Sequence, residues 1–191
     1  MGSDHMKTWK SFFKITDYER WKLVEVESEG WASRSTIIAS LIPSNSSVLD
    51  LGAGSQTLKR YLHDCNYQPC NLFQTTPDTM VCNFNKNIYP KIHNEFDFVV
   101  CNGILEYIRK PKVFLKNIMP MGRKYIISYA IKLPKYSLKW RLSMGWFNHY
   151  TETELENLFV SLGYKFKIIG QWNEQIIYYL KHSSRSEIFL E

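Results

Sequence analysis

The chain has 191 residues, of which 45% are hydrophobic and 22% are charged. This composition is typical of a globular protein and excludes a disordered or collagen-like chain, and the length fits one domain with a substantial core. The net charge of +6 permits a nucleic acid or a phosphorylated ligand as a partner but requires neither.

The N-terminal segment divides into two parts. Residues 1–6 contain no apolar stretch of the kind that a signal peptide needs, and we interpret them as a remnant of expression cloning that ends at the native Met6. Residues 7–191 are expected to form a single domain. Aromatic and charged side chains mix over residues 7–28, which predicts one or two lead-in helices. We interpret residues 7–30 as lid helices, with a dimer interface as the alternative.

Cysteine content and hydropathy favour a reduced, cytoplasmic protein. No uninterrupted apolar run reaches the roughly 18 residues that a membrane-spanning helix needs. No Cys-x-x-Cys pair is present, and three of the cysteines lie in or beside apolar, strand-like segments, which disfavours a zinc site and a disulfide framework. The four cysteines are Cys65, Cys70, Cys82 and Cys101.

Strand-like and helix-like segments alternate along the chain, which is typical of an α/β layer fold. Residues 33–42 predict a helix that Pro43 ends, and Ser47–Leu51 predicts a short apolar strand. A tight turn over Gly52–Gly54 follows, and Ser55 has the side chain to cap a helix after it.

The next segments predict further strands. Residues 66–73 form the second, although Pro69 inside it cannot donate a hydrogen bond to a neighbouring strand. Residues 79–84 form the third, and residues 96–101 are a clear fourth. Pro111 suits the first turn of a helix that carries apolar residues on one face.

A long connection follows the fifth strand. Residues 125–131 are almost continuously apolar, as expected of a buried central strand. Residues 132–147 then form a substrate-side insertion, because a connection of this length in a compact domain is usually functional. Its side chains suit closure over an anionic or sugar-like substrate, with a solvated surface helix as the alternative. The basic and aromatic residues are Lys132, Lys135, Tyr136, Lys139, Trp140, Arg141 and Trp146.

The C-terminal part ends in a hairpin. Residues 151–154 read Thr-Glu-Thr-Glu, a capping box that predicts a helix start, and Gly163 can close that helix. Residues 164–169 and 175–180 predict two strands separated by only a few residues. No crossover helix fits between them, so they must pair antiparallel.

Residues 48–55 hold the most informative motif. The predicted strand ends close to Asp50, and Gly52 and Gly54 allow the backbone to turn tightly and to approach a ligand. The helix that follows offers its N-terminal amides and the positive end of its dipole. A carboxylate at this place would repel the pyrophosphate of a dinucleotide and would suit a cationic or amine-bearing ligand.

Three segments in order resemble the class I S-adenosylmethionine-dependent methyltransferases. Residues 49–54 match their first motif, residues 96–107 look like their fourth-strand motif, and residues 149–155 look like the helix entry before their final hairpin. The resemblance covers residues 30–180. It implies an α/β, Rossmann-like sheet of seven strands with an antiparallel C-terminal hairpin and helices on both faces, in agreement with the hairpin expected from the short loop.

The resemblance implies S-adenosylmethionine as cofactor and S-adenosylhomocysteine as its product. It places Asn71 at the ribose hydroxyls, Asn83 at the adenine amino group, and the glycine turn at the methionine end. Asn102 and Gly103 would flank the cofactor and face the substrate. The residues that it assigns to the cofactor are Asp50, Gly52, Ala53, Gly54, Asn71, Asn83, Asn102 and Gly103.

Three positions depart from the family pattern. Gln56 stands where the first motif usually has its third glycine, and Asn71 and Asn83 stand where acids are usual. Asn can still bond a hydroxyl but is neutral, and both residues also suit structural turns. Either the affinity for the cofactor is weakened, or the neighbouring Asp78 does part of this work.

Proton acceptors are expected near the fourth strand and before the capping box. His149 has an unperturbed pKa that suits proton transfer near neutrality, with Tyr150 and Tyr107 as further candidates, although His149 can equally be structural. Glu106 precedes Tyr107 where relatives carry a histidine, so we expect no metal and expect Glu106 to orient a loop. Arg34 is a candidate to bind a carboxylate or phosphate.

These features predict an enzyme that transfers a methyl group from S-adenosylmethionine. O-methylation of a small molecule or of a sugar or glycan precursor fits a small chain without an appended recognition domain, and nucleic acid is disfavoured because no dense basic stripe is present. An RNA methyltransferase and a non-catalytic relative that acts through a protein partner are the alternatives. A nicotinamide-dependent reductase is disfavoured by the single Gly-x-Gly and the terminal hairpin.

Overall fold

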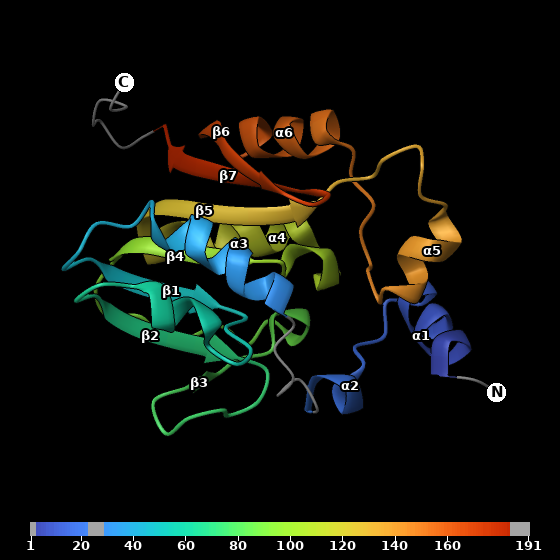
Figure 1. Cartoon of the computed structure of the whole chain (residues 1–191), viewed down its shortest axis with the longest axis horizontal. Coiled ribbons are helices and arrows are strands. Elements are labelled where there is room, and N and C mark those ends of the chain that lie inside the picture. Colours follow the sequence, from blue (N-terminus) through green and yellow to red (C-terminus); the bar gives the residue numbers. More distant parts are fainter. Residues whose placement is uncertain (1–2, 23–28, 184–191) are drawn as a thin grey trace.

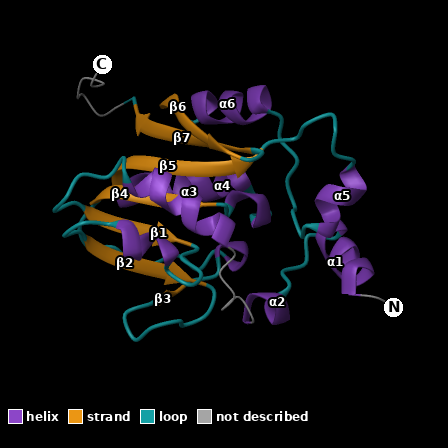
Figure 2. Cartoon of the chain, viewed as in Figure 1, coloured by secondary structure: helices purple, strands orange, loops and turns teal. Residues whose placement is uncertain are grey.

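Helices cover both faces of one central sheet in the computed structural model, which describes residues 3–22 and 29–183 (Figures 1 and 2). The described residues form seven strands in the order β3-β2-β1-β4-β5-β7-β6. The pairs from β3 to β5 are parallel, and β7 runs antiparallel to both of its neighbours. The expected seven-stranded, Rossmann-like fold is confirmed. The strands are β1 (Ser47–Leu51), β2 (Asn66–Asn71), β3 (Met80–Val81), β4 (Phe96–Asn102), β5 (Gly122–Ala130), β6 (Tyr164–Trp172) and β7 (Gln175–His182).

The central strands are apolar on both faces because both faces are covered. Along β5, Ile126 points to one side of the sheet with Ile38 of the α3 helix, whereas Tyr125 and Ile127 point to the other side. The α-helices are α1 (Ser3–Phe12), α2 (Tyr18–Lys22), α3 (Glu29–Ala39), α4 (Pro111–Ile118), α5 (Leu138–Ser143) and α6 (Glu152–Ser161). In Figure 1, α3 lies in front of the sheet, and α4 and α6 cover its far side and upper edge.

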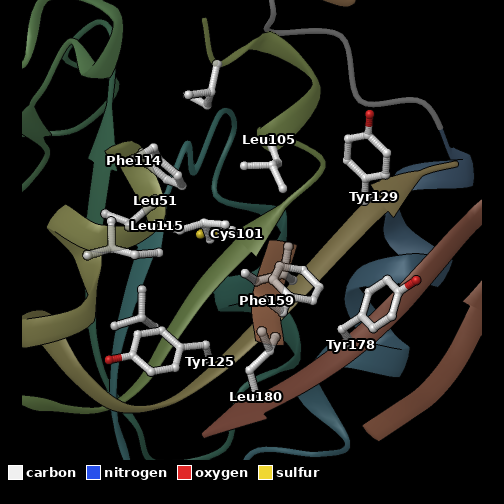
Figure 3. Packing of buried hydrophobic residues seen from close by; sticks show 14 of the residues in the cluster. Leu51, Cys101, Leu105, Phe114, Leu115, Tyr125, Tyr129, Phe159, Tyr178 and Leu180 are labelled. Carbon is white, nitrogen blue, oxygen red and sulfur yellow. The ribbon is translucent and has the colours of Figure 1, made fainter. Parts of the chain in front are cut away.

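The larger core fills the space between the sheet and the helices α4 and α6 (Figure 3). Phe114 of α4 and Phe159 of α6 are almost completely buried there. The Tyr125 hydroxyl, also buried, donates to the backbone carbonyl of Gly122 at 2.6 Å, which satisfies its polar atom inside the core. This packing holds β4 and β5 rigidly, and their carboxyl ends carry residues of the site.

Two predictions about local structure are wrong. The segment after the glycine turn is a 3-10 helix (Thr57–Tyr61) whose preceding residue is Gln56, and no side chain caps it. Ser55 instead lies 3.1 Å from the Thr57 hydroxyl. The third strand is limited to Met80–Val81, because Asn83 pairs with Ile88 and so begins a separate turn.

Pro69 lies inside β2 without interrupting the backbone hydrogen bonds between β2 and β1. The carbonyl of Cys70 accepts from Gly52, so the hydrogen-bonding groups of Cys70 face β1 and those of Pro69 face the opposite side. On that side β3 pairs only with Cys70 and Asn71. The missing N–H of Pro69 therefore costs no hydrogen bond, as on an edge strand.

The predictions for the C-terminal half are confirmed. Pro111 occupies the first turn of α4, and Thr151 and Glu154 form both hydrogen bonds of a capping box at the start of α6. Gly163 ends the following turn with φ +79°. The two final strands form the antiparallel hairpin, although each is longer than expected.

The N-terminal helices lie beside α5 at one end of the sheet (Figure 1). Helix α1 begins at Ser3, inside the segment interpreted as a cloning remnant, and part of the predicted lead-in segment, residues 23–28, lies outside the described residues. An Arg20 guanidinium nitrogen donates to the Met144 carbonyl at 2.8 Å and so ties the α2 segment to the end of α5. Within the described ranges, no helix is long and apolar enough to cross a bilayer.

Candidate functional site

A cavity of about 690 Å³ opens where the parallel strands end. In open α/β sheets, ligands bind outside the carboxyl ends of the strands, where the strand order reverses. That reversal lies between β1 and β4 here, and residues that follow each of these strands line the cavity. The α2 segment and the region of α5 line it from the other side.

The glycine turn needs glycine for two different physical reasons. Gly52 has φ +82°, and a side chain there would meet Ile104 at 2.4 Å. Gly54 has φ +53°, but the space around it is open, so a ligand can approach its backbone. The amides of Gly52 and Ala53 both donate to the Cys70 carbonyl, at 2.7 Å and 3.1 Å, which holds the turn against β2.

Three buried ionisable side chains line the cavity, and each has one polar atom without a hydrogen-bond partner among the described residues. Asp50, Arg34 and Glu106 are 2%, 6% and 1% exposed. The unpaired atoms are Asp50 Oδ1, Arg34 Nε and Glu106 Oε2. Leaving such groups unsatisfied costs free energy, and native proteins retain them where a ligand or a function uses them.

Another atom of each of these side chains is held by a protein contact. Asp50 Oδ2 accepts from the Tyr67 hydroxyl at 2.7 Å, and Glu106 Oε1 accepts from the Ala130 amide at 2.7 Å. An Arg34 guanidinium nitrogen donates to Gln175 Oε1 at 2.5 Å. Each group is therefore oriented by the fold, with its unpaired atom left over.

Burial dominates the ionisation of all three groups. It raises the pKa of Asp50 to about 6, against the opposing effects of the Tyr67 hydrogen bond and the Arg34 charge. Burial also raises the pKa of Glu106 and lowers that of Arg34. A ligand that brings its own opposite charges would favour the charged forms.

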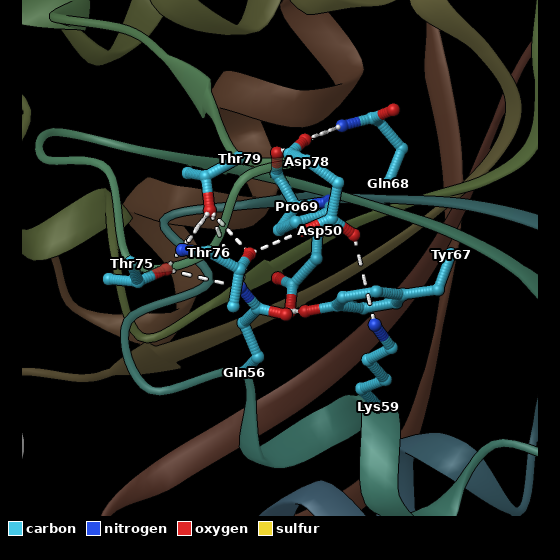
Figure 4. Close-up of polar contacts among 10 residues, drawn as sticks. All are labelled: Asp50, Gln56, Lys59, Tyr67, Gln68, Pro69, Thr75, Thr76, Asp78 and Thr79. Carbon is cyan, nitrogen blue, oxygen red and sulfur yellow. Dashed lines mark hydrogen bonds and ion pairs between the residues drawn. The ribbon is translucent and has the colours of Figure 1, made fainter.

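Gln56 closes a polar network around the loop that follows β2 (Figure 4). Its side-chain amide donates to the hydroxyls of Thr75 at 3.1 Å and Thr76 at 2.6 Å. The Thr79 hydroxyl accepts from the Thr76 amide at 3.0 Å and so closes the loop on itself. Residues of this loop line the cavity, so Gln56, which has φ +60°, fixes one of its walls.

All residues expected at the cofactor line this one cavity. The amide of Asn83 donates to the Tyr18 hydroxyl at 2.9 Å, which connects the end of β3 to α2. The amide of Asn102 donates to Ser35 at 3.3 Å. Gly103 has φ +71°, and a side chain there would meet the Arg34 guanidinium at 2.6 Å.

The comparisons with known proteins agree with this geometry. A family model described as a methyltransferase domain matches residues 28–167. The chain belongs to this family. The resemblance expected from the sequence is thereby confirmed, whereas no curated protein sequence matches the chain.

Solved structures share the fold of this methyltransferase at low sequence identity. The 1,6-didemethyltoxoflavin-N1-methyltransferase of Burkholderia thailandensis, solved with 1,6-didemethyltoxoflavin and S-adenosylhomocysteine, is 15% identical with a TM-score of 0.64, over 96% of this chain and 92% of that one. A structure described as a putative O-methyltransferase of Nostoc punctiforme is 15% identical with a TM-score of 0.66, over 93% and 67%. The plantazolicin methyltransferase BpumL, solved with a substrate analogue and S-adenosylhomocysteine, is 12% identical with a TM-score of 0.63, over 94% and 96%.

Only one of the three candidate proton acceptors of the methyltransferase lies in the described cavity lining. Tyr107 lines the cavity, its hydroxyl accepts from Trp146 Nε1 at 3.2 Å, and burial raises its pKa. His149 and Tyr150 are not among the described residues that line the cavity. Arg141 Nε donates to His149 Nδ1 at 3.2 Å, and burial together with the Arg141 charge lowers the pKa of His149 to about 4.

Arg141 explains why His149 is drawn away from the cavity. The Arg141 side chain is 1% exposed and donates to the carbonyls of Ile131 at 2.8 Å and Ala130 at 2.7 Å. It thereby fastens the insertion after β5 to the end of that strand. His149 serves this buried guanidinium as an acceptor, which requires its neutral form.

Several lining residues were not singled out from the sequence. Arg20 comes from the lead-in segment and Phe73 from the loop after β2, whereas Trp172 ends β6 and Gln175 begins β7, on either side of the hairpin turn. No local pattern marks these positions, because each reaches the cavity only through the packing of its element on the sheet. The aromatic character of residues 7–28 and 132–147 was the available signal, and Trp21, Trp140 and Trp146 of those segments do line the cavity.

Proposed function

We propose that this methyltransferase transfers the methyl group of S-adenosylmethionine to an oxygen atom of a small-molecule acceptor. The observation that carries the proposal is one cavity that joins three buried charged side chains to an aromatic roof. Its volume of about 690 Å³ lies within the range of roughly 300–1,000 Å³ that is typical of small-molecule sites.

The buried charges fit the amino-acid end of the cofactor. A guanidinium suits a carboxylate, and a carboxylate suits an ammonium group, so Arg34 and Asp50 together match a zwitterion. Their unpaired atoms, Arg34 Nε and Asp50 Oδ1, are the groups that such a ligand would satisfy. When bound, S-adenosylmethionine supplies a methyl group made electrophilic by its positively charged sulfur.

The side chains of the chain itself position the acceptor and exclude water. For a donor that is already electrophilic, alignment of the two reactants supplies most of the rate enhancement. The Tyr107 hydroxyl accepts from Trp146, and its own hydrogen has no acceptor among the described residues, so it can donate to the acceptor oxygen. A general base is absent from this proposal because His149 lies outside the cavity lining with a lowered pKa.

Residues 16–22 and 132–147 serve as the roof over this site. The pair Arg20 and Met144 joins them, and both segments contribute lining residues. A roof of this kind leaves room for a small acceptor and not for a folded polymer.

A non-catalytic relative is the second candidate, because neutral Asn71 and Asn83 line the cavity where acids are usual. It predicts binding of the nucleoside ligand without turnover. Methyl transfer to any oxygen acceptor, followed as formation of S-adenosylhomocysteine, would exclude it.

A thermal melt tests the proposal first. At about 100 times its dissociation constant, a ligand adds about 2.7 kcal/mol, which raises the midpoint of a domain of this size by about 5–10 °C. We expect this shift with S-adenosylmethionine and S-adenosylhomocysteine, no shift with NADH, and loss of the shift in Asp50→Ala. No shift with either adenosyl compound at millimolar concentration would refute the proposal.

A further inference from the structure

A continuous chain of aromatic rings runs along the side of the cavity that faces away from the glycine turn. Trp21 meets Tyr107 edge to face, with ring centroids 4.7 Å apart. The Tyr107 hydroxyl accepts from Trp146, and the Trp146 ring meets Trp140 at 5.7 Å. Trp140 in turn stacks on Tyr136 at 4.1 Å. We call these five residues the aromatic wall.

The aromatic wall is assembled from three segments that are far apart in the sequence. Trp21 belongs to α2, Tyr107 follows β4, and the other rings lie in or beside α5. Of the five, Trp21, Tyr107, Trp140 and Trp146 line the cavity, and the first three of these are only half-buried. Rings that served the core alone would be covered completely, whereas these leave part of their surface toward the cavity.

Two arginines lie against this wall without a carboxylate ion pair among the described residues. Arg141, over the Trp146 ring at 4.6 Å, is buried and already donates to backbone carbonyls, which leaves Arg20 for a ligand. The Arg20 guanidinium carbon lies 4.9 Å from the centre of the Trp21 ring and 5.7 Å from that of Tyr107. One of its nitrogens donates to the Met144 carbonyl, and within residues 3–22 and 29–183 no carboxylate forms an ion pair with it. Two carboxylates line the cavity near this wall. Glu174 is engaged by the Tyr136 hydroxyl at 2.5 Å and by Lys135 at 3.3 Å, and buried Glu106 accepts from the Ala130 amide, so neither forms an ion pair with Arg20.

Few hydrogen-bonding groups remain beside the aromatic wall for a polyhydroxylated molecule. The Asn85 side chain lines the cavity, but it donates to the Thr16 hydroxyl and the Tyr107 carbonyl and accepts from the Arg109 amide. A sugar bound here would lose water from its hydroxyls without full replacement, which costs free energy. A flat apolar ring loses no hydrogen bonds on transfer to such a wall.

We infer that the acceptor is a planar aromatic molecule that carries an acidic group, with its ring on the aromatic wall and its anion toward Arg20. The inference rests on the proposed function and adds the substrate class to it. An ionised acceptor oxygen uses its own electron pair to bond the methyl carbon, while the pair of the breaking carbon–sulfur bond goes to sulfur. No proton moves, in keeping with a cavity in which we assign no general base.

Calorimetric titration of the protein saturated with S-adenosylhomocysteine tests the substrate class with four probes. These are 2-naphthoate, its saturated analogue decahydro-2-naphthoate, the uncharged 2-naphthol, and glucose 6-phosphate. We expect 2-naphthoate to bind at least ten-fold more tightly than the saturated analogue and glucose 6-phosphate. Equal affinity for 2-naphthoate and its saturated analogue, or tighter binding of glucose 6-phosphate, would overturn the inference.

Two variants separate the contributions of ring and charge. Trp140→Leu should weaken 2-naphthoate and 2-naphthol alike by at least five-fold, because both use the ring. Arg20→Gln should weaken 2-naphthoate by at least five-fold more than 2-naphthol, because only the first carries a charge, whereas loosening of the Met144 contact affects both. Trp9→Leu is the matched control: this tryptophan is 55% exposed on α1, outside the cavity lining, and its loss should change neither affinity.

The same titrations distinguish failure of the proposed function from failure of the inferred substrate class. If S-adenosylhomocysteine itself does not bind, the proposed function fails and the substrate class falls with it. If S-adenosylhomocysteine binds and the four probes show no preference for the aromatic anion, only the present inference fails.

Discussion

At the scale of single residues, the site of this methyltransferase holds a buried carboxylate, Asp50, whose ionised form is disfavoured by its surroundings. Asp50 keeps one oxygen unpaired and has its pKa raised to about 6 by burial. Asp97, at the opposite end of the sheet, has its pKa lowered by hydrogen bonds from the Ser47 amide and hydroxyl. The contributions of Asp50 and Asp97 to folding stability therefore change with pH in opposite directions. Only Asp50 lines the cavity.

The pH dependence of stability should reveal Asp50. A raised pKa means that the folded chain binds the proton more tightly than the unfolded chain, so the contribution of Asp50 to stability falls as the pH rises from about 4 through about 6. Asp50→Asn should remove this fall and stabilise the ligand-free protein at pH 7 by up to about 3 kcal/mol, at about 1.4 kcal/mol for each pKa unit. Urea denaturation between pH 4 and pH 8 measures the effect.

Asp97→Asn provides the control of opposite sign. Its lowered pKa gives stability that is present at neutral pH and lost as the pH falls, so the variant should be less stable than the parent protein at pH 7. A pH profile of Asp50→Asn that parallels that of the parent protein would show that Asp50 is not the buried, destabilised carboxylate described here.

At the scale of elements, the wall formed by the loop after β2 depends on one side chain of the glycine turn. Gln56 stands where the family usually has glycine, in a left-handed conformation that costs a non-glycine residue of the order of 1–2 kcal/mol. Its hydrogen bonds to Thr75 and Thr76 offset that cost and hold the loop (Figure 4). The departure from the family pattern thus has a structural role.

The variant Gln56→Gly should separate the backbone strain at residue 56 from the role of the Gln56 side chain in positioning the loop after β2. Glycine relieves the left-handed backbone but releases the loop, so the melting temperature should change by only a few degrees while the affinity for S-adenosylhomocysteine falls by about five- to ten-fold. Calorimetry and thermal melts on the same samples measure both effects. The matched control is Asn45→Gly, because Asn45 has φ +64° on an exposed turn away from the cavity. This variant should have a higher melting temperature and an unchanged affinity for S-adenosylhomocysteine. Unchanged affinity in Gln56→Gly would contradict the role of the loop.

At the scale of the whole molecule, two segments that are remote in sequence close one end of the sheet. Residues 16–22 and residues 138–147 both line the cavity opposite the glycine turn, and Arg20 joins them through the Met144 carbonyl. The side that we propose for the cofactor and the side that we propose for the acceptor are thereby built from different parts of the chain. Occupation of one side should be distinguishable from occupation of both.

Hydrogen exchange should show this division in two steps. S-adenosylhomocysteine alone should protect residues 52–57 and 71–76, since these belong to the glycine turn and the loop after β2. Further addition of 2-naphthoate should extend protection to residues 16–22 and 138–147. Helix α6 (Glu152–Ser161), which lies outside the cavity lining, serves as the internal reference and should not change. Protection of all four segments by the first ligand alone would contradict the division.

The sequence by itself determined the architecture of this protein. Several features depend only on residues that are close together in the chain. They are the β1 strand, its glycine turn, the capping box at Thr151 and the terminal hairpin. Local periodicity, caps and loop length decide such features, so they can be predicted without knowledge of distant contacts. The cofactor candidates came instead from the resemblance to the methyltransferase family, whose motifs lie at the carboxyl ends of neighbouring parallel strands.

Only the tertiary structure decided which polar and aromatic groups share the cavity. In sequence His149 is the first candidate for proton transfer and Tyr107 only a further one, yet the buried Arg141 holds His149 as an acceptor while Tyr107 reaches the cavity. The joining of Trp21 to Tyr107, and of Gln56 to the loop after β2, likewise depends on contacts between separate elements. The physical reason is that burial and charge at a site are sums over neighbours in space, and no local pattern of residues contains those neighbours.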